Sequence, residues 1–186
     1  GHDRPSADML GRFAAAAGLQ MSTAPVLLDE TTGQAVCSSA IRRAIVSDGD
    51  MDAAARMLGR AYALVGKVVS GRRIGRTIGF PTANIRTDAR MAVPRCGVYA
   101  ATVDIAGRRY GAMLNIGTAP TVNAADTEVR LEVHIFDFDG DIYGATLSVE
   151  PRRYLRAECR FADVSSLSAR LRDDAAAAKA ILAEIP

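Results

Sequence analysis

A glycine-rich run that ends in GFPTAN carries residue types that can hold phosphate groups and a metal ion. Gly71, Gly75 and Gly79 let the backbone turn tightly, so that peptide N–H groups can point at phosphate oxygens. Thr82 and Asn84 offer a hydroxyl and an amide oxygen two positions apart, and hard oxygen donors of this kind suit Mg²⁺. The run therefore predicts a site for a nucleoside triphosphate and its metal. A glycine-rich surface loop with asparagine in a turn explains the same residues.

A second candidate is the glutamate in the stretch VRLEVHIFDF, residues 129–138. Its alternating pattern places the aliphatic residues on one face of a strand and Arg130, Glu132 and His134 on the other. If the polar face lines a cleft, Glu132 can accept a proton from a hydroxyl that attacks a phosphorus atom. If it does not, Glu132 is simply solvated, and the pattern leaves both interpretations open.

Two further stretches either border a pocket or are ordinary connections. In NIGTAPTV, residues 115–122, an asparagine and a glycine end an expected strand. The basic and aromatic segment 152–161 connects the last expected strand to a helix, where Arg156 and Phe161 are able to touch a planar ligand. For these two stretches taken alone, a hairpin end and a solvated connection are the commoner explanations.

The bulk composition is that of an ordinary globular protein. The chain has 186 residues, of which 49% are hydrophobic and 24% charged, with a formal net charge of +2. No run approaches the roughly 20 apolar residues that a membrane helix needs, and the first ten residues lack a signal-peptide pattern. We therefore expect a cytoplasmic protein with no membrane partner.

Neither a zinc site nor a nucleic-acid partner is expected. Cys37, Cys96 and Cys159 are widely separated and show no metal-ligand spacing, so we interpret them as reduced and structural. The pI of about 8.6 is only mildly basic, and the chain has five Tyr, five Phe and no Trp. An oligonucleotide-binding barrel needs exposed stacking aromatics and a basic groove, which this composition does not favour.

The first 60 residues predict a small helical region with one strand. Apolar residues recur at helical spacing in three segments, with Ser6, Ser38 and Asp50 as candidate N-caps. The three segments are 6–17, 38–47 and 50–59. The apolar stretch 24–29, between the first two, predicts one short strand.

From Tyr62 onward the apolar pattern changes to a period of two and predicts strands. The expected strands are 62–71, 97–107, 108–117, 129–138 and 143–151. Ala106-Gly107 predicts a hairpin turn, and Asp139-Gly140-Asp141 predicts another. Five or six mostly antiparallel strands without intervening helices favour a small barrel or a sandwich.

The last segment, 163–185, predicts one amphipathic helix that is capped by Ser165 or Ser166. The residues of its expected inward stripe are Leu167, Leu171, Ala175, Ala178 and Leu182.

Taken together, these stretches resemble the riboflavin kinase module of bacterial bifunctional riboflavin kinase/FAD synthetases. The family pattern runs GxVxxGxxxGRxxGFPTAN, then GVY, NIGxxPT, ExHxxDF and YG, and ends with a helix. The matching residues are Gly66, Val68, Gly71, Gly75, Arg76, Gly79, Phe80, Pro81, Thr82, Ala83, Asn84, Gly97, Val98, Tyr99, Asn115, Ile116, Gly117, Pro120, Thr121, Glu132, His134, Asp137, Phe138, Tyr143 and Gly144. Their order and spacing hold over residues 62–185.

The resemblance implies a fold and an activity. The implied fold is mainly β: a six-stranded antiparallel Greek-key barrel with a long C-terminal helix, preceded by a small partial α/β segment. The implied activity is transfer of the γ-phosphoryl group of ATP to the 5′-hydroxyl of riboflavin, which gives FMN and ADP and uses Mg²⁺. The alternative is a barrel that binds flavin without catalysis, although a mere binder needs neither metal ligands nor a base.

The resemblance also implies roles for individual residues. Glu132 resembles the general base, and Thr82 and Asn84 resemble the ligands of Mg²⁺ and phosphate. The nucleotide-binding residues that it implies are Gly71, Gly75, Arg76, Gly79, Phe80, Thr82 and Tyr143. The flavin-binding residues that it implies are Arg152, Tyr154, Arg156 and Phe161. His134, on the same face as Glu132, either tunes that carboxylate or binds phosphate.

Residues 1–60 resemble the last part of the family's FMN adenylyltransferase domain, and residues 61–186 resemble its kinase domain. The stretch VCSSAIRRAI resembles the SSTxIR nucleotide motif of the first domain, with Cys37 where serine is frequent. The HxGH-type phosphate motif of that domain is missing, since the only histidines are His2 and His134. We therefore expect a remnant that does not adenylylate FMN, and the sequence leaves the oligomeric state open.

Overall fold

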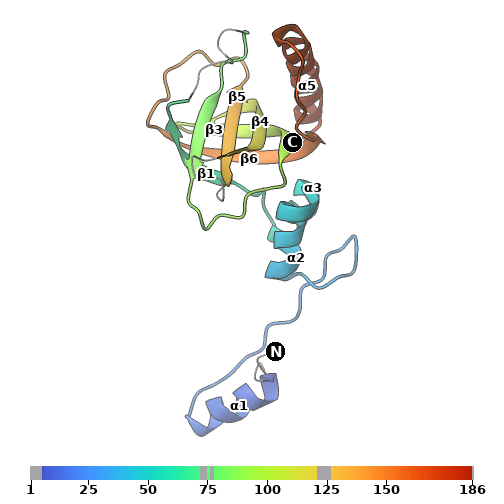
Figure 1. The fold of residues 1–186 in the computed structure, drawn as a ribbon. Coiled ribbons are helices and arrows are strands. Elements are labelled where there is room, and N and C mark those ends of the chain that lie inside the picture. The colour runs from blue at the N-terminus through green and yellow to red at the C-terminus, as the bar shows by residue number, and fades with distance from the viewer. Residues whose placement is uncertain (1–5, 72–74, 76–77, 121–126, 186) are drawn as a thin grey trace. The chain divides into compact units, whose positions relative to one another are not determined.

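The computed structural model describes residues 6–71, 75, 78–120 and 127–185 (Figure 1). The chain divides into two compact units, Gly1–Val36 and Cys37–Pro186. Residues 37–60 share a compact unit with the strands, because Ala44, Ile45 and further apolar residues before residue 60 belong to the same core cluster as the strands. The division after residue 60 into two domains of different origin stays a prediction.

The described residues of the first unit, 6–36, contain one helix, α1 (Ala7–Ala16). Ser6 caps it as predicted, because its hydroxyl accepts a hydrogen bond of 3.2 Å from the Met9 amide. The strand predicted at 24–29 is wrong, since the described residues of this stretch form only an isolated bridge between Leu28 and Ala35.

A short helical segment opens the second unit. It consists of α2 (Ser38–Arg43), the π-helical turn η1 (Ala44–Asp48) and α3 (Met51–Leu58). Asp50 caps α3 as predicted, because its carboxylate accepts a bond of 2.8 Å from the Ala53 amide. The N-cap of α2 is Cys37 and not Ser38, and it makes no side-chain cap hydrogen bond.

Six antiparallel strands close into a barrel in the order β1-β2-β5-β4-β3-β6. The strands are β1 (Leu64–Val69), β2 (Ala83–Thr87), β3 (Gly97–Ile105), β4 (Arg108–Pro120), β5 (Thr127–Ile135) and β6 (Thr146–Arg156). Strands β3, β4 and β5 follow one another in the chain and each pairs with the next. The chain then returns so that β6 pairs with β3, which is a Greek-key arrangement. The predicted six-stranded Greek-key barrel is therefore confirmed.

One of the two predicted hairpins is present and the other is wrong. Ala106 and Gly107 both have positive φ, 52° and 79°, and join β3 to β4 in the manner of a type I′ turn. Asp139-Gly140-Asp141 is not a hairpin turn, because β5 pairs with β2 and β4 whereas β6 pairs with β1 and β3. Residues 136–145 therefore connect strands that are not neighbours.

The sequence missed one strand, β2, and ended another, β6, too early. The five residues of β2 follow the proline of GFPTAN and show too short an alternation to stand out in the sequence. β6 continues to Arg156, which pairs with Val98 of β3, so the first half of the predicted connection 152–161 is strand.

Aliphatic side chains fill the barrel. A long helix, α5 (Val164–Glu184), stands beside the barrel in Figure 1. A second apolar layer lies between this helix and the outside of the barrel. In this layer Val98, Ala100 and Met113 pack with residues of the predicted inward stripe of α5. These stripe residues are Leu171, Ala175, Ala178 and Leu182. The cap of α5 is Asp163 and not Ser165 or Ser166, because the Asp163 carboxylate accepts a bond of 2.7 Å from the Ser166 amide.

In the part of the chain that the structure describes, no helix combines the length and the apolar character that crossing a membrane requires.

Candidate active site

The polar face of β5 lies outside the barrel and has an asparagine on each side. Leu131, Val133 and Ile135 are buried, as the alternation predicts. Glu132 stands directly opposite Asn84 of β2 and directly opposite Asn115 of β4. Because paired residues in antiparallel strands project to the same face, the three polar side chains lie side by side.

These side chains line a cavity of about 370 Å³, here called the helix-side cavity. Its polar lining consists of Thr82, Asn84, Asn115, Arg130, Glu132, His134, Arg156 and Glu158. Its apolar lining includes Ile78, Phe80, Val98, Met113, Phe161, Leu167 and Leu171. An apolar wall with a few converging polar groups is typical of a small-molecule site. The sequence left open whether the polar face of β5 lines a cleft or is simply solvated. In the structure it lines a cavity, while the aliphatic face fills the barrel.

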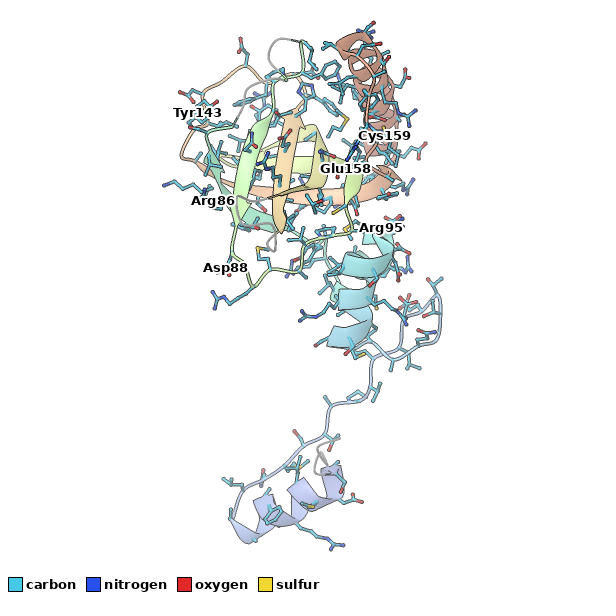
Figure 2. All side chains as sticks on the ribbon, viewed as in Figure 1. Arg86, Asp88, Arg95, Tyr143, Glu158 and Cys159 are labelled. Atoms are coloured by element: carbon cyan, nitrogen blue, oxygen red, sulfur yellow. The ribbon has the colours of Figure 1, made fainter. Side chains whose placement is uncertain are left out.

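A second cavity of about 720 Å³, the loop-side cavity, opens next to the first. It is lined by Pro81, Thr82 and the residues from Phe138 to Tyr143, among others. Thr82 lines both cavities and is therefore a residue that they share. Figure 2 shows Tyr143, which lines the loop-side cavity, and Glu158, which lines the helix-side cavity, on opposite sides of the barrel.

Two glycines allow the loop before β2 to lie against the predicted metal ligands. A side chain at Gly71 would overlap the Asn84 side chain, and one at Gly75 would overlap the Phe80 carbonyl and approach Thr82 Oγ1 to 3.5 Å. The Phe80 amide donates a bond of 2.8 Å to the Gly75 carbonyl, which closes this part of the loop. Gly79 has φ 79°, a conformation that favours glycine. Arg76 lies outside the described residues.

The donor set fits a magnesium ion better than a transition metal. Thr82 and Asn84 supply a hydroxyl and an amide oxygen to the helix-side cavity, beside the Glu132 carboxylate. Among the residues that the structure describes, no group of three or more His, Cys, Asp or Glu side chains could hold a metal. Mg²⁺ takes few protein ligands and completes its shell with water and phosphate oxygens, so two hard donors suffice.

His134 contacts the chain just before Thr82. Its Nδ1 lies 2.8 Å from the Pro81 carbonyl oxygen. Its ring lies 5.1 Å from the Phe80 ring and 5.6 Å from the Phe136 ring, measured between centroids.

The far wall of the helix-side cavity is anchored by an ion pair. Arg156 Nε donates bonds of 2.9 Å to both carboxylate oxygens of Asp174, and Nη2 donates one of 2.6 Å. The two side chains are only 13% and 4% exposed. These hydrogen bonds hold the pKa of Arg156 above its ordinary value. Arg156 Nη1 also donates to the Ala157 carbonyl, and the guanidinium lies 5.9 Å from the Phe161 ring centroid.

Comparison with known proteins gives the family. A family model described as riboflavin kinase matches residues 58–182. The chain belongs to the riboflavin kinase family. The predicted resemblance is thereby confirmed.

Relatives within this family are longer than the chain. A bifunctional riboflavin kinase/FMN adenylyltransferase from Pseudomonas fluorescens is 42% identical over 154 residues, which cover 83% of this chain and 49% of that protein. One of the same description from Haemophilus influenzae is 40% identical and covers 79% and 47%. A crystal structure described as a macrolide-efflux protein from Streptococcus pneumoniae has a TM-score of 0.77 at 36% identity, and covers 84% of this chain and 50% of that one. The chain thus spans about half the length of these proteins.

Among the residues that the sequence did not single out are Glu158, which lines the helix-side cavity, and Asp174, which holds the lining residue Arg156. The Glu158 carboxylate accepts a hydrogen bond of 3.3 Å from Asn115 Nδ2. It also lies against Gly117, so that a side chain at position 117 would overlap it. Asp174 is the buried partner of Arg156. An acidic residue on the inward face of an amphipathic helix needs a buried partner, and this is the signal that could have revealed Asp174.

Two predicted flavin-binding residues do not line either cavity. Arg152 pairs with Glu150 at 3.4 Å. Tyr154 packs edge-on against Tyr99, with ring centroids 5.2 Å apart, and belongs to the border of the barrel core. No described contact supports their binding of flavin, which stays a prediction, whereas Arg156 and Phe161 both line the helix-side cavity.

Proposed function

We propose that this chain transfers the γ-phosphoryl group of ATP to the 5′-hydroxyl of riboflavin, forming FMN and ADP. The observation that carries the proposal is that Thr82 lines two cavities, one of which also holds Glu132 beside Asn84. A kinase needs two substrates to meet end to end at one point, with a base on the acceptor side.

The nucleotide occupies the loop-side cavity, with Tyr143 at its far end and its phosphates directed at Thr82. The glycine loop reaches these phosphates from the helix side of Thr82, where Gly75 and Thr82 line the same cavity, and supplies peptide N–H groups to them. Riboflavin occupies the helix-side cavity, where its ring packs on the apolar lining near Phe161 and its ribityl chain extends toward Glu132. This orientation uses the mixed character of the cavity, apolar below α5 and polar along β5.

The chemistry then divides among the residues present. The riboflavin 5′-oxygen forms a bond to the γ-phosphorus while the bond from phosphorus to the β-phosphate oxygen breaks, and ADP leaves. The Glu132 carboxylate accepts the hydroxyl proton. When bound by Thr82 and Asn84, Mg²⁺ neutralises charge on the phosphates. Positioning and charge neutralisation are what this reaction mainly demands of a protein.

Adenylylation of FMN is not part of the proposal. The relatives that carry both names are about twice as long as this chain, and the identity of residues 1–60 as a remnant of the second domain stays a prediction. A cytoplasmic location and the absence of nucleic-acid partners also stay predictions.

The test is incubation of the purified chain with riboflavin and ATP, with and without Mg²⁺, followed by chromatographic separation of the flavins. Metal-dependent FMN supports the proposal. Riboflavin binding without FMN would favour a barrel that binds flavin without catalysis. Formation of FAD would show that the first 60 residues retain adenylylating activity.

A further inference from the structure

The residues that lead into Thr82 lie beyond the backbone ladder of β2. The described pairing of β2 with β5 begins with Ala83 opposite Val133 and continues with Asn84 opposite Glu132. Thr82 therefore stands one residue outside this ladder, although it lines both cavities. A side chain that must hold a position between two substrates needs another anchor, because a misplacement of about 1 Å can cost about 100-fold in rate.

A side chain of β5 provides that anchor. His134 Nδ1 lies 2.8 Å from the carbonyl oxygen of Pro81, the residue immediately before Thr82. A carbonyl oxygen can only accept a hydrogen bond, so Nδ1 must carry the proton. The Phe80 and Phe136 rings contact the imidazole from two directions, at centroid distances of 5.1 and 5.6 Å, and restrict its rotation.

The contact between the Phe80 ring and His134 also fixes the end of the glycine loop. The Phe80 amide donates to the Gly75 carbonyl at 2.8 Å, so the loop closes on the residue whose ring touches His134. The imidazole thus contacts both residues that precede Thr82, Phe80 through a ring contact and Pro81 through Nδ1.

We propose that His134 is a positioning residue that sets the place of Thr82 between the two cavities through its Nδ1–H bond to Pro81. This role differs from the two that its place in the sequence suggested, namely tuning Glu132 and binding phosphate, because it acts through Nδ1 and the Pro81 carbonyl. The inference rests on the proposed kinase function for its catalytic consequence, whereas the bond itself does not depend on that function.

The first test reads the tautomer directly and needs no activity. A free neutral histidine favours the tautomer with the proton on Nε2, so a protonated Nδ1 reports the bond to Pro81. Long-range ¹H–¹⁵N correlation spectra of the ¹⁵N-labelled chain, with a His2→Ala variant to assign the second imidazole, give the protonation of each nitrogen. We expect Nδ1–H for His134, and a neutral ring protonated only on Nε2 would overturn the proposal.

The second test compares two substitutions, each of which replaces one of the two ring nitrogens of His134 with an amide nitrogen. In His134→Asn the amide nitrogen replaces Nδ1, whereas in His134→Gln it replaces Nε2. We expect the asparagine variant to keep kcat within about threefold of the parent and the glutamine variant to lose about 10-fold to 100-fold. Riboflavin affinity, measured by quenching of flavin fluorescence, should change less than about threefold in both.

The reverse order would overturn the proposal, because a group that acts on phosphate or substrate through Nε2 is mimicked by glutamine. Equal activity of both variants and the parent would overturn it as well. If both variants lose the fold, as judged by their melting temperatures, the tautomer measurement still decides. If the parent shows Nδ1–H but forms no FMN, the proposed function fails while the placement of Thr82 by His134 stands.

Discussion

Arg156 at the end of β6 and Asp174 in the middle of α5 form a buried ion pair in which two guanidinium nitrogens contact both carboxylate oxygens. The pair ties the barrel to the helix that covers it and holds the start of the segment that walls the helix-side cavity. Arg170 adds a second contact to the same carboxylate at 3.3 Å.

Removing Asp174 should destabilise the protein strongly. Asp174→Ala leaves the Arg156 guanidinium buried without its counter-ion, and breaking a buried pair of this kind costs about 3 kcal/mol in the free energy of unfolding. Chemical denaturation measures this difference. Asp173→Ala is the matched control, because Asp173 is the exposed neighbour on the same helix and should change the free energy little. Equal effects of the two substitutions would mean that the ion pair contributes nothing.

Local patterns predicted much of this fold. The alternation of β5 gave the correct buried and polar faces, and Ala106-Gly107 gave the correct turn, because both depend on neighbouring residues. Strand order depends on distant pairing, so Asp139-Gly140-Asp141 was wrongly predicted as a hairpin. The register that sets Glu132 between Asn84 and Asn115 is also nonlocal, and no single stretch of sequence contains it.

The helical segment before the barrel should be needed for the stability of the kinase domain. Ile45 and Met51 are 2% and 3% exposed and belong to the barrel's core cluster. A fragment of residues 37–186 should therefore match the parent in its free energy of unfolding. A fragment of residues 61–186 should lose roughly 3–6 kcal/mol, from about 1.5–3 kcal/mol for each of these two side chains. Denaturant unfolding of both fragments checks this, and equal stability would place the domain boundary at residue 60, as the sequence suggested.

Asn84 should contribute to the binding of Mg²⁺. Asn84→Ala removes an amide oxygen from the helix-side cavity, so we expect the Mg²⁺ concentration for half-maximal FMN formation to rise at least about tenfold. Riboflavin affinity without metal should stay within about threefold. The control is Arg86→Ala, an exposed position on the same strand that does not line this cavity. An unchanged Mg²⁺ requirement in Asn84→Ala would remove Asn84 from the metal site.

The cap of α5 should give a pH-dependent contribution to stability. The bond from the Ser166 amide holds the pKa of Asp163 below its ordinary value. A carboxylate with a lowered pKa stabilises the folded state above its ordinary pKa, and this contribution is lost as the pH falls through the lowered value.

The measurement is the melting temperature of the parent, Asp163→Ala and Asp163→Asn between neutral and acidic pH. The alanine variant should melt lower than the parent at neutral pH, and the difference should shrink in acid. Asparagine keeps a neutral cap acceptor, so the difference between Asp163→Asn and Asp163→Ala should not depend on pH. A gap between parent and Asp163→Ala that stays constant in acid would contradict the assignment of Asp163 as a charged cap.

The central claim is that Glu132, on the polar face of β5, accepts the proton of the riboflavin 5′-hydroxyl. Glu132→Gln keeps the size and hydrogen-bonding capacity of the side chain and removes its basicity. Turnover to FMN and riboflavin affinity, measured on the same preparation of this variant, test the claim most directly. We predict that kcat falls by about 10²-fold to 10⁴-fold, the range typical of a general base, while riboflavin affinity stays within about threefold. A variant that forms FMN nearly as fast as the parent would contradict the account.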